Sequence, residues 1–550
     1  MTSSVSRVGT SSESAELRAR WISTGLWSDM TVGAVLADSM QRNSARRVRV
    51  WSRVHPTEES LGEVFEKALA FSVALRSLGV NPGDRVVVQL PNWSEALVCL
   101  IGTIFSGAVV VPMAPFYGAS DRRLAVADSL AKVLVLPAQV GGRAMAEEAL
   151  EDWGRAPNLE HIIAVGDTVP GKCIKLPSLL HGAIDPRAVH AGSADDLAFL
   201  AFTSGTTGRA KGVRHTSRSL VADAIHHSQV VSPRQAPPLS ASPISHVAGL
   251  FTSLFNPILR GDDIHLIDRW DANDAVRAGR AHELSLGSGT PLFMQSIIDR
   301  PDFERDDLRH TRYASFGGGP ISTEFCLRVD SLGIDVIRAY GSTEQLISTG
   351  ASPADPPDKR LRTDGRPLAG VELRIVDEAE CALPTGTPGD LWTRSPSLCD
   401  GYLDDAMTKE AFTEDGWFRT GDIGMLDADG WLTIVDRRKD IIIRAGLNIS
   451  AREVETFIEV HPAIAEVAVV GEFDSRTGER VVAVIRQHAG TGTLTAADLH
   501  QTMSERGAAR HKWPERVVRV EDFPRTATGK VSKAELREAL RAGQHLETEA

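Results

Sequence analysis

The chain has 550 residues, which is too many for one hydrophobic core, so we expect at least two domains. Its formal net charge of −12 argues against binding to nucleic acid or to an anionic membrane, both of which need clustered Lys and Arg. The five cysteines show no C-x-x-C spacing, which argues against a disulfide framework and against a zinc site and is typical of a reducing compartment: Cys99, Cys173, Cys326, Cys381 and Cys399.

The first twenty residues are polar and contain no apolar segment of the signal-peptide type, so we expect a cytoplasmic protein. Residues 96–120 carry no charge and resemble a membrane span by hydropathy alone. Gly102, Gly107 and Pro112 interrupt this stretch, and AVVVPM within it is typical of a strand. We therefore expect a buried helix followed by a buried parallel strand, and no transmembrane segment.

Helical and strand-like runs alternate between residues 60 and 204. Residues 61–78 place apolar side chains on one helical face and stop at Gly79. Short apolar runs are predicted as strands at 85–90, 108–113, 132–137, 161–165 and 196–204. This alternation predicts an α/β fold with parallel sheets covered by helices, in which ligands bind beyond the carboxyl ends of the strands.

Residues 365–435 contain short strands separated by Gly, Pro and Asp, which indicates a small, antiparallel, barrel-like part. The charged run DRRKD follows, and a smaller α+β pattern begins after it. We place a domain boundary at 435–438. The prediction is a large N-terminal domain over residues 1–435 and a small, mobile C-terminal domain over residues 436–550.

The segment TSGTTGRAKG at residues 203–212 begins where a predicted strand ends. Its backbone N–H groups and hydroxyls can wrap a polyphosphate, and Lys211 adds a positive charge. The alternative is a flexible turn. The segment lacks the Gly-Lys-Ser/Thr ending of a Walker A loop, which argues against a P-loop NTPase or kinase.

Two further motifs fit a nucleotide. In FGGGP, residues 316–320, consecutive glycines let the backbone approach a flat ring closely, although a turn is an equally good explanation. In YGSTE, residues 340–344, the tyrosine can stack on a base, the threonine can bind a phosphate, and the glutamate can hold Mg²⁺.

Two motifs lie nearer the C-terminus. GWFRTGD, residues 416–422, presents Asp422, which could bind a ribose diol or simply make an Asx-turn between strands. PRTATGKVSKAEL, residues 524–536, carries Lys530 on a short loop ahead of a helix, where an isolated lysine is usually solvated.

In this order the motifs resemble those of the acyl-adenylate-forming enzymes, which include acyl-CoA synthetases, adenylation domains of peptide synthetases and beetle luciferases. The resemblance covers roughly residues 25–540 and includes DRRKDIIIRAGLNISAREVE. It implies an AMP-forming acid–thiol ligase that uses ATP, Mg²⁺ and coenzyme A. The carboxylate and ATP would give acyl-AMP and pyrophosphate, and CoA would then displace AMP.

The resemblance also implies residue roles in binding ATP. The phosphates would be held by Thr203, Ser204, Gly205, Thr206, Thr207, Gly208 and Lys211. Adenine would lie between Tyr340 and the glycines Gly317, Gly318 and Gly319, and Asp422 and Arg437 would bind the ribose hydroxyls. Thr343 would contact the α-phosphate, and Glu344 would ligate Mg²⁺.

The same family implies that the C-terminal domain changes position between the two half-reactions. Lys530 would neutralise charge between the attacking carboxylate and the α-phosphate in the first step. Lys439 would be the hinge, and the loop with Gly446 would then help form the channel for the CoA thiol.

For the acid, the resemblance places His246 near the carboxylate, where a structural histidine is the alternative. The substrate pocket would include Val247, Gly249, Phe251, Gly341 and Leu346. We lean towards an aryl, alicyclic or medium-chain fatty acid, because a hydrophobic pocket separates neighbouring methylenes by only about 1–3 kcal/mol and residue types alone do not fix its ligand.

Two other functions remain to be compared with a CoA ligase. The closer alternative passes the acyl group to the phosphopantetheine of a carrier protein. Free CoA is favoured as the acceptor because no carrier domain is recognisable in this sequence and because His246 is present. The other is a non-catalytic nucleotide-binding protein, which the retained Lys530, Glu344 and Asp422 argue against. Homodimers are common among similar proteins, and a homodimer is one possible assembly here.

Overall fold

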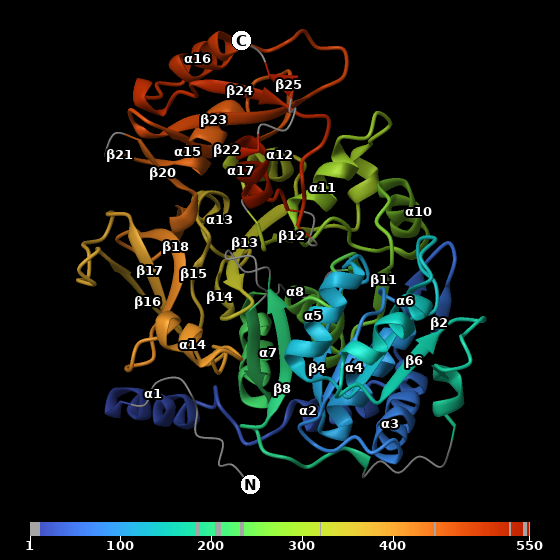
Figure 1. Cartoon of the computed structure of the whole chain (residues 1–550). Coiled ribbons are helices and arrows are strands. Elements are labelled where there is room, and N and C mark those ends of the chain that lie inside the picture. The colour runs from blue at the N-terminus through green and yellow to red at the C-terminus, as the bar shows by residue number, and fades with distance from the viewer. Residues whose placement is uncertain are drawn as a thin grey trace. The chain divides into compact units, whose positions relative to one another are not determined.

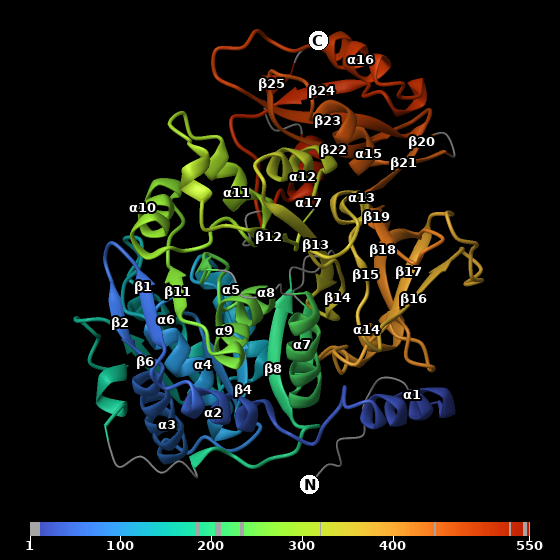
Figure 2. The same ribbon diagram turned by 180° about the vertical axis from the view of Figure 1, so that it is seen from behind.

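The computed structural model describes residues 11–181, 188–203, 211–230, 236–319, 321–444, 447–526, 530–542 and 547–548 (Figures 1 and 2). The chain forms two compact units. The first comprises Met1–Glu372 and Thr393–Phe418, and the second comprises Leu373–Trp392 and Arg419–Ala550. The boundary that the sequence suggests at 435–438 stays a prediction.

Most helices of the described chain belong to the first unit. They are α1 (Ser12–Ser23), α2 (Val32–Arg42), α3 (Leu61–Ser77), α4 (Ser94–Ser106), α5 (Ala119–Ser129), α6 (Met145–Asp152), α7 (Ser217–Val230), α8 (Val247–Gly249), α9 (Asn256–Arg260), α10 (Ala272–His282), α11 (Pro291–Ile298), α12 (Thr323–Ser331), α13 (Pro357–Arg362) and α14 (Asp405–Ala411). The predicted helix at 61–78 is α3, which begins with a capping box between Ser60 and Glu63.

A seven-stranded sheet with the order β7-β6-β5-β3-β4-β8-β9 dominates the first unit. Its strands are β3 (Arg85–Val88), β4 (Val109–Pro112), β5 (Val133–Pro137), β6 (His161–Val165), β7 (Ile174–Lys175), β8 (Leu197–Thr203) and β9 (Lys211–Thr216). The pairs from β7 to β8 are parallel, as the alternating pattern predicts, and β9 returns antiparallel to β8. The five predicted strands are therefore confirmed within a mixed sheet.

Two four-stranded sheets complete the first unit. The sheet β10-β11-β1-β2 is formed by β1 (Arg47–Trp51), β2 (Thr57–Ser60), β10 (Leu239–Ser240) and β11 (Ile264–Ile267). The sheet β12-β13-β14-β15 is formed by β12 (Tyr313–Phe316), β13 (Asp335–Ser342), β14 (Leu346–Gly350) and β15 (Arg366–Pro367). β12 and β13 are parallel, so their carboxyl ends meet at one edge.

The uncharged stretch at 96–120 is explained by burial in protein. Residues Ala96–Ser106 of α4 are all buried, α4 packs on α3, and β4 is buried over its whole length (Figure 1). Gly102 lies against α3, because a Cβ at this position would be 2.6 Å from the Ala68 carbonyl oxygen. None of the helices in the described ranges is long and apolar enough to span a membrane.

The second unit contains a six-stranded sheet in which β21-β20-β23-β24-β25 are neighbours and β22 pairs with β23. These strands are β20 (Ile441–Arg444), β21 (Leu447–Ser450), β22 (Ile464–Asp474), β23 (Gly478–Gln487), β24 (Arg516–Arg519) and β25 (Glu547–Thr548). The helices α15 (Ala451–Ile458), α16 (Ala496–Glu505) and α17 (Lys533–Arg541) accompany them, which is the predicted α+β pattern.

The predicted barrel-like part is a four-stranded sheet with the order β16-β17-β18-β19. Its strands are β16 (Glu372–Val376), β17 (Gly389–Arg394), β18 (Phe418–Leu426) and β19 (Leu432–Arg437). All residues of these strands except Glu372, Thr393, Arg394 and Phe418 belong to the second unit. All five cysteines are free, and three of them are buried, which agrees with the predicted absence of a disulfide framework.

Candidate active site

The two ends of the predicted phosphate loop are held together by a β-ladder. Thr203 ends β8, Lys211 begins β9, and the two residues are register partners in this antiparallel pair. The residues Ser204, Gly205, Thr206, Thr207 and Gly208 lie outside the described residues. The ladder therefore places the two ends of the predicted loop, Thr203 and Lys211, at the carboxyl end of β8 in a mainly parallel sheet.

Lys211 and Glu344, which are far apart in sequence, both contact Tyr402. The Lys211 ammonium lies 5.3 Å from the ring centroid, within the range of a cation–π contact. The Tyr402 hydroxyl donates a 2.9 Å hydrogen bond to Glu344 Oε1. Burial, and after it the negative charge of Glu344, raises the pKa of Tyr402 far above its usual value, so the phenol remains a neutral donor.

Thr343 is fixed through its backbone by a buried histidine. His215 Nε2 donates a 2.7 Å hydrogen bond to the Thr343 carbonyl oxygen, and His215 Nδ1 lies 3.1 Å from the Ser219 hydroxyl. Since a carbonyl only accepts, Nε2 carries the proton. Desolvation lowers the pKa of His215, which favours the neutral ring. The Ser219 hydroxyl beside Nδ1 also donates to the Thr216 carbonyl oxygen at 3.0 Å.

The glycines predicted to contact adenine follow the end of β12. The Gly317 N–H donates to the Gly289 carbonyl at 3.1 Å, and a Cβ on Gly317 would be 3.1 Å from the Ala339 carbonyl oxygen. Gly318 has a positive φ of 76°, and a Cβ there would meet no atom within 4 Å. Tyr340 lies on the neighbouring strand β13, so the structure brings the glycines and this tyrosine to the same sheet edge.

Gly341 and Leu346 of the predicted pocket flank the turn that carries Thr343 and Glu344. A Cβ on Gly341 would be only 1.8 Å from the Leu346 carbonyl oxygen, so no larger residue fits without moving this turn. Leu346 is buried and has a φ of 54°, which is unusual for leucine. The Ile347 N–H donates to Asp223 Oδ1 at 3.0 Å, which ties α7 to this segment.

His246, Val247, Gly249 and Phe251 lie at the start of α8 and the π-helical turn Leu250–Phe255 that continues it. His246 is the N-cap residue of α8, and its Nδ1 accepts a 3.4 Å hydrogen bond from the Ala248 N–H. Phe251 is only 1% exposed and makes an edge contact with Phe255. The structure thus gathers the predicted acyl residues on one short helical segment, and their contact with an acid stays a prediction.

Replacing Gly249 with alanine is expected to destabilise the first unit by about 1–3 kcal/mol, the usual cost of overpacking. A Cβ on Gly249 would be 2.0 Å from the Pro243 carbonyl oxygen, and a backbone atom cannot rotate away. Chemical unfolding of the purified protein measures the change. Gly154→Ala is the matched control, because a Cβ at Gly154 would meet no atom within 4 Å. Equal stability of the two variants would contradict this close approach.

In the second unit, the predicted ribose residues form an ion pair. Asp422 on β18 and Arg437 on β19 are register partners, and Arg437 Nε lies 3.3 Å from Asp422 Oδ1. Asp422 is buried and its N–H donates to the Thr420 hydroxyl oxygen, whereas the Arg437 side chain is 55% exposed. A buried carboxylate beside an exposed guanidinium is suited to binding hydroxyl groups.

The charges of this ion pair influence the pKa of Lys530. Desolvation of its ammonium group, and after it the positive charge of Arg437, lowers the pKa of Lys530 to about 8, while Asp422 acts in the opposite direction. A lowered lysine pKa is typical of a functional ammonium group. The structure therefore relates Lys530 to Asp422 and Arg437 within the second unit.

The pH dependence of adenylation is expected to reflect this pKa. With a pKa of about 8, Lys530 is about 90% charged at pH 7 and about 10% charged at pH 9. The kcat/KM for acyl-AMP formation should therefore fall as the pH rises through about 8, because the uncharged amine does not neutralise phosphate. Lys530→Arg should remove this fall, since arginine stays protonated. An unchanged alkaline limb in Lys530→Arg would contradict the assignment.

The predicted hinge residue Lys439 lies in a short 3₁₀ turn, Arg438–Asp440, between β19 and β20. Desolvation and the charge of Arg437 lower the pKa of Lys439. Arg537 of α17 donates to the Lys439 carbonyl oxygen at 3.3 Å and to Asp440 Oδ1 at 2.7 Å. These bonds attach the turn to the second unit. Gly446 lies outside the described residues.

The residues fit the Mg²⁺ that the family implies. The described residues contain no group of three or more His, Cys, Asp or Glu side chains arranged to hold a metal by themselves. Mg²⁺ usually takes one or two carboxylates together with phosphate oxygens and waters, so a single carboxylate suffices beside ATP. Glu344, half-buried and oriented by Tyr402, is such a carboxylate.

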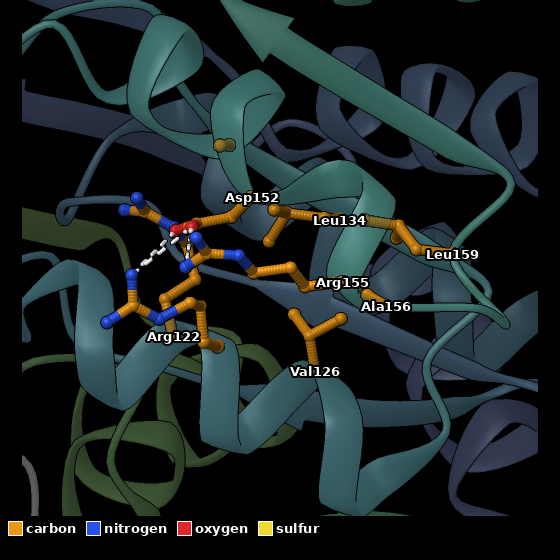
Figure 3. A pocket seen from close by; sticks show the side chains of 9 residues that line it. Arg122, Val126, Leu134, Asp152, Arg155, Ala156 and Leu159 are labelled. Atoms are coloured by element: carbon orange, nitrogen blue, oxygen red, sulfur yellow. Dashed lines mark hydrogen bonds and ion pairs between the residues drawn. The ribbon is translucent and has the colours of Figure 1, made fainter.

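A hollow elsewhere in the first unit contains none of the predicted site residues. Figure 3 shows it between α5 and the end of α6, lined by apolar side chains and by arginines around Asp152. Asp152 lies 3.2 Å from Arg123 and 3.7 Å from Arg155, while Arg122 pairs with Glu148 at 3.2 Å. Because the acidic groups already pair these arginines, we regard the hollow as structural.

Sequence reasoning missed three residues that organise the site: His215, Asp223 and Tyr402. His215 lies three residues after the phosphate motif, and Tyr402 is one of only four tyrosines in the chain. Tyr402 reaches the site because it bridges to Val213 of β9 across almost 190 residues of sequence. In the sequence, only the rarity of tyrosine and the position of Tyr402 directly after a glycine could have indicated its role.

Comparison with known proteins decides the family. The family described as "AMP-binding enzyme" matches residues 36–403, and the "AMP-binding enzyme C-terminal domain" matches residues 453–530. The chain belongs to the AMP-binding enzyme family. The first match covers the phosphate motif, both nucleotide motifs and Tyr402, and the second ends at Lys530. Membership confirms the resemblance to acyl-adenylate-forming enzymes.

Curated relatives of this AMP-binding enzyme are ligases of several acids. It is 28% identical to the medium-chain fatty-acid–CoA ligase of Escherichia coli strain K12, with 95% of this chain and 93% of that protein covered. It is 33% identical to a 3-[(3aS,4S,7aS)-7a-methyl-1,5-dioxo-octahydro-1H-inden-4-yl]propanoyl:CoA ligase of Mycobacterium tuberculosis strain H37Rv, over 86% and 93% of the two chains. It is also 29% identical to the 2,3-dihydroxybenzoate-AMP ligase of Bacillus subtilis strain 168, over 96% of each chain.

A solved structure shows the same fold. ATP-bound MatB from Rhodopseudomonas palustris superposes on this AMP-binding enzyme with a TM-score of 0.82 at 25% identity, covering 93% of this chain and 99% of MatB. The predicted fold class, a large α/β N-terminal domain followed by a small α+β domain, is thereby confirmed. The likeness to an ATP-bound structure and the family itself support the use of ATP by this chain.

Proposed function

We propose that this enzyme is an AMP-forming acid–CoA ligase. In the first step a carboxylate oxygen attacks the α-phosphorus of ATP, an acyl C(O)–O–P bond forms, and the bond to the β-phosphate breaks as pyrophosphate leaves. In the second step the CoA thiolate attacks the acyl carbon, and AMP leaves. The observation that carries the proposal is that Lys211 and Glu344, from two separate nucleotide motifs, both contact Tyr402, the lysine at its ring and the glutamate at its hydroxyl.

Residues of the first unit are proposed to bind ATP. The β- and γ-phosphates would be held by Thr203, Lys211 and the loop between them. The pairing of Thr203 with Lys211 in the β8–β9 ladder supports this assignment. The glycines after β12 and Tyr340 would hold adenine. Thr343 would contact the α-phosphate, and the bond from His215 to its carbonyl would keep this turn in place.

Glu344 is proposed as the protein ligand of Mg²⁺. Bound Mg²⁺ supplies positive charge that reduces repulsion between phosphate oxygens and an anionic nucleophile. The neutral Tyr402 phenol holds one carboxylate oxygen of Glu344 and so fixes its orientation. Lys211, over the ring of the same tyrosine, adds a further positive charge, which favours a polyanionic ligand.

Lys530 is proposed to stabilise the transition state of adenylation. The carboxylate is already ionised at neutral pH, so this step needs charge neutralisation and no general base. Asp422 and Arg437 would hold the ribose hydroxyls. The domain extents 1–435 and 436–550, the hinge at Lys439 and a role for Gly446 in the CoA step remain part of this proposal.

The acid is proposed to be an aryl, alicyclic or medium-chain fatty acid, held near His246, Val247, Gly249, Phe251, Gly341 and Leu346. The acids named for its relatives support this range, since they include a medium-chain fatty acid, a fused-ring propanoate and indoleacetate. A carrier-protein acceptor is the second candidate, because one relative over 96% of the chain is named as an AMP ligase.

The acceptor is tested by transfer from the adenylate. The enzyme is incubated with ATP, Mg²⁺ and an accepted acid, and the acyl group is followed to free CoA or to a phosphopantetheinylated carrier protein. Rapid acyl-CoA formation is the expected result. Acid-dependent exchange of labelled pyrophosphate into ATP, without thioester formation on CoA, would show adenylation with a carrier acceptor instead.

A further inference from the structure

Asp223 on α7 is a buried carboxylate that the proposed reaction does not use. Its side chain is 1% exposed. Oδ1 accepts the hydrogen bond from the Ile347 N–H, directly after the predicted pocket residue Leu346. Oδ2 makes no hydrogen bond within the described part of the chain, although His227 Nε2 lies 3.4 Å from it. A buried carboxyl oxygen without a hydrogen bond is costly unless a donor lies nearby.

His227 follows Asp223 by one helical turn and lies flat on a predicted pocket residue. The imidazole and the Phe251 ring are nearly parallel, with an interplanar angle of 8° and centroids 5.4 Å apart. The His227 side chain is 12% exposed, compared with 1% for Asp223 and for Phe251. Of these three side chains, His227 therefore offers the most surface to a ligand.

The stack changes the expected role of Phe251. The sequence suggested that this phenylalanine could stack on a ring of the acid. In the structure His227 covers one face of Phe251, and Phe255 makes an edge contact with the same ring at 5.2 Å. One face of Phe251 is therefore covered by an imidazole, which forms hydrogen bonds.

We propose that His227, oriented by Asp223 and Phe251, is a specificity-determining residue that selects a carboxylic acid with a hydroxyl group on an otherwise apolar body. This inference rests on the proposed ligase function. Asp223 favours a proton on His227 Nε2, so in the neutral ring Nδ1 is an acceptor for the hydroxyl of the acid. If the ring is protonated, Nδ1 donates to the oxygen of the same hydroxyl. A hydroxyl suits both states.

Two other histidines near Asp223 are engaged elsewhere, which agrees with an oriented His227. His226, the preceding residue, donates from Nε2 to the Ala369 carbonyl at 2.8 Å. Desolvation lowers the pKa of His226, so this ring is neutral. His215, the other histidine whose titration is influenced by Asp223, is neutral for the same reason. Among these three histidines, His227 is therefore the one whose Nε2 lies within reach of Asp223 Oδ2, at 3.4 Å.

The experiment compares matched acids that differ only by a hydroxyl: benzoate with the three hydroxybenzoates, cyclohexanecarboxylate with its hydroxy derivatives, and octanoate with hydroxyoctanoates. AMP formation gives kcat/KM for each acid. The wild type should prefer the best hydroxylated acid over its unsubstituted partner by about 10- to 100-fold. His227→Phe, which keeps a flat ring on Phe251, should reduce this ratio to about one.

Asp223→Asn is the second variant, since it keeps an acceptor for the Ile347 N–H and removes the charge beside His227. It should reduce the hydroxyl preference less than His227→Phe does. Thermal unfolding of both variants checks that they fold. The ratio between paired acids separates selection from a structural role, which would lower both rates equally.

The outcomes are distinguishable. Turnover by the wild type without a preference for any hydroxylated acid, or an unchanged ratio in His227→Phe, would overturn this inference and leave the ligase function standing. An equal loss for both members of every pair would show that His227 only supports the fold. Absence of AMP formation by the wild type with every acid would contradict the proposed function itself, and this inference with it.

Discussion

Replacing Lys530 with alanine is expected to lower the rate of acyl-AMP formation about 100- to 1,000-fold, the usual effect of removing one preorganised electrostatic group. The carboxylate and the α-phosphate are both negative, and Lys530 is the group proposed to reduce their repulsion. Its pKa of about 8 keeps it mainly charged at neutral pH. Acid-dependent exchange of labelled pyrophosphate into ATP measures the change.

The second half-reaction provides the contrast for this variant. If synthetic acyl-AMP is supplied with CoA, Lys530→Ala should form acyl-CoA within a few-fold of the wild-type rate, because this step needs no bridge between two anions. Lys172→Ala, which removes another exposed lysine, is the control and should leave both steps unchanged. An equal loss in both half-reactions would contradict a role for Lys530 confined to adenylation.

Replacing Glu344 with glutamine is expected to lower adenylation by about 100- to 1,000-fold at ordinary Mg²⁺ concentrations. Glutamine keeps an acceptor for the Tyr402 hydroxyl and has nearly the same shape, so the effect isolates the negative charge. Excess Mg²⁺ should restore part of the activity, because the lost carboxylate weakens metal binding. Initial rates over a Mg²⁺ titration measure both effects.

Two further variants sharpen the test of Glu344. Tyr402→Phe removes the hydrogen bond that orients the carboxylate and should have a smaller effect, about tenfold, in the same direction. Glu324→Gln on α12 is the control, since this exposed glutamate belongs to the same unit. Wild-type Mg²⁺ dependence in Glu344→Gln would exclude Glu344 as the metal ligand.

The sequence predicted the strands of the large sheet well, because fully buried parallel strands appear as short, continuous apolar runs. β5 and β6 begin within one residue of the predicted positions and end where predicted. The antiparallel return of β9 was not predicted. Lys211–Thr216 is a largely polar strand that shows no apolar pattern, and its pairing with β8 is a tertiary contact.

The sequence predicted the motif residues of the site but not the residues that hold them in place. Lys211, Thr343 and Glu344 were chosen from local patterns, and the structure brings them together. Tyr402 and His215 act through contacts to residues more than 50 positions away, and such contacts depend on tertiary packing that a single sequence does not display. His227 and Asp223 lie on a helix with no motif, and only the ring of Phe251 and the turn at Ile347 reveal them.

The measurement that tests the account most directly is the product of ATP turnover. The enzyme is incubated with ATP, Mg²⁺, CoA and a panel of aryl, alicyclic and medium-chain acids, and nucleotides and thioesters are separated. We expect AMP, pyrophosphate and an acyl-CoA in equal amounts, formed only when an accepted acid is present. Formation of ADP, or no acid-dependent turnover with any member of the panel, would contradict the account.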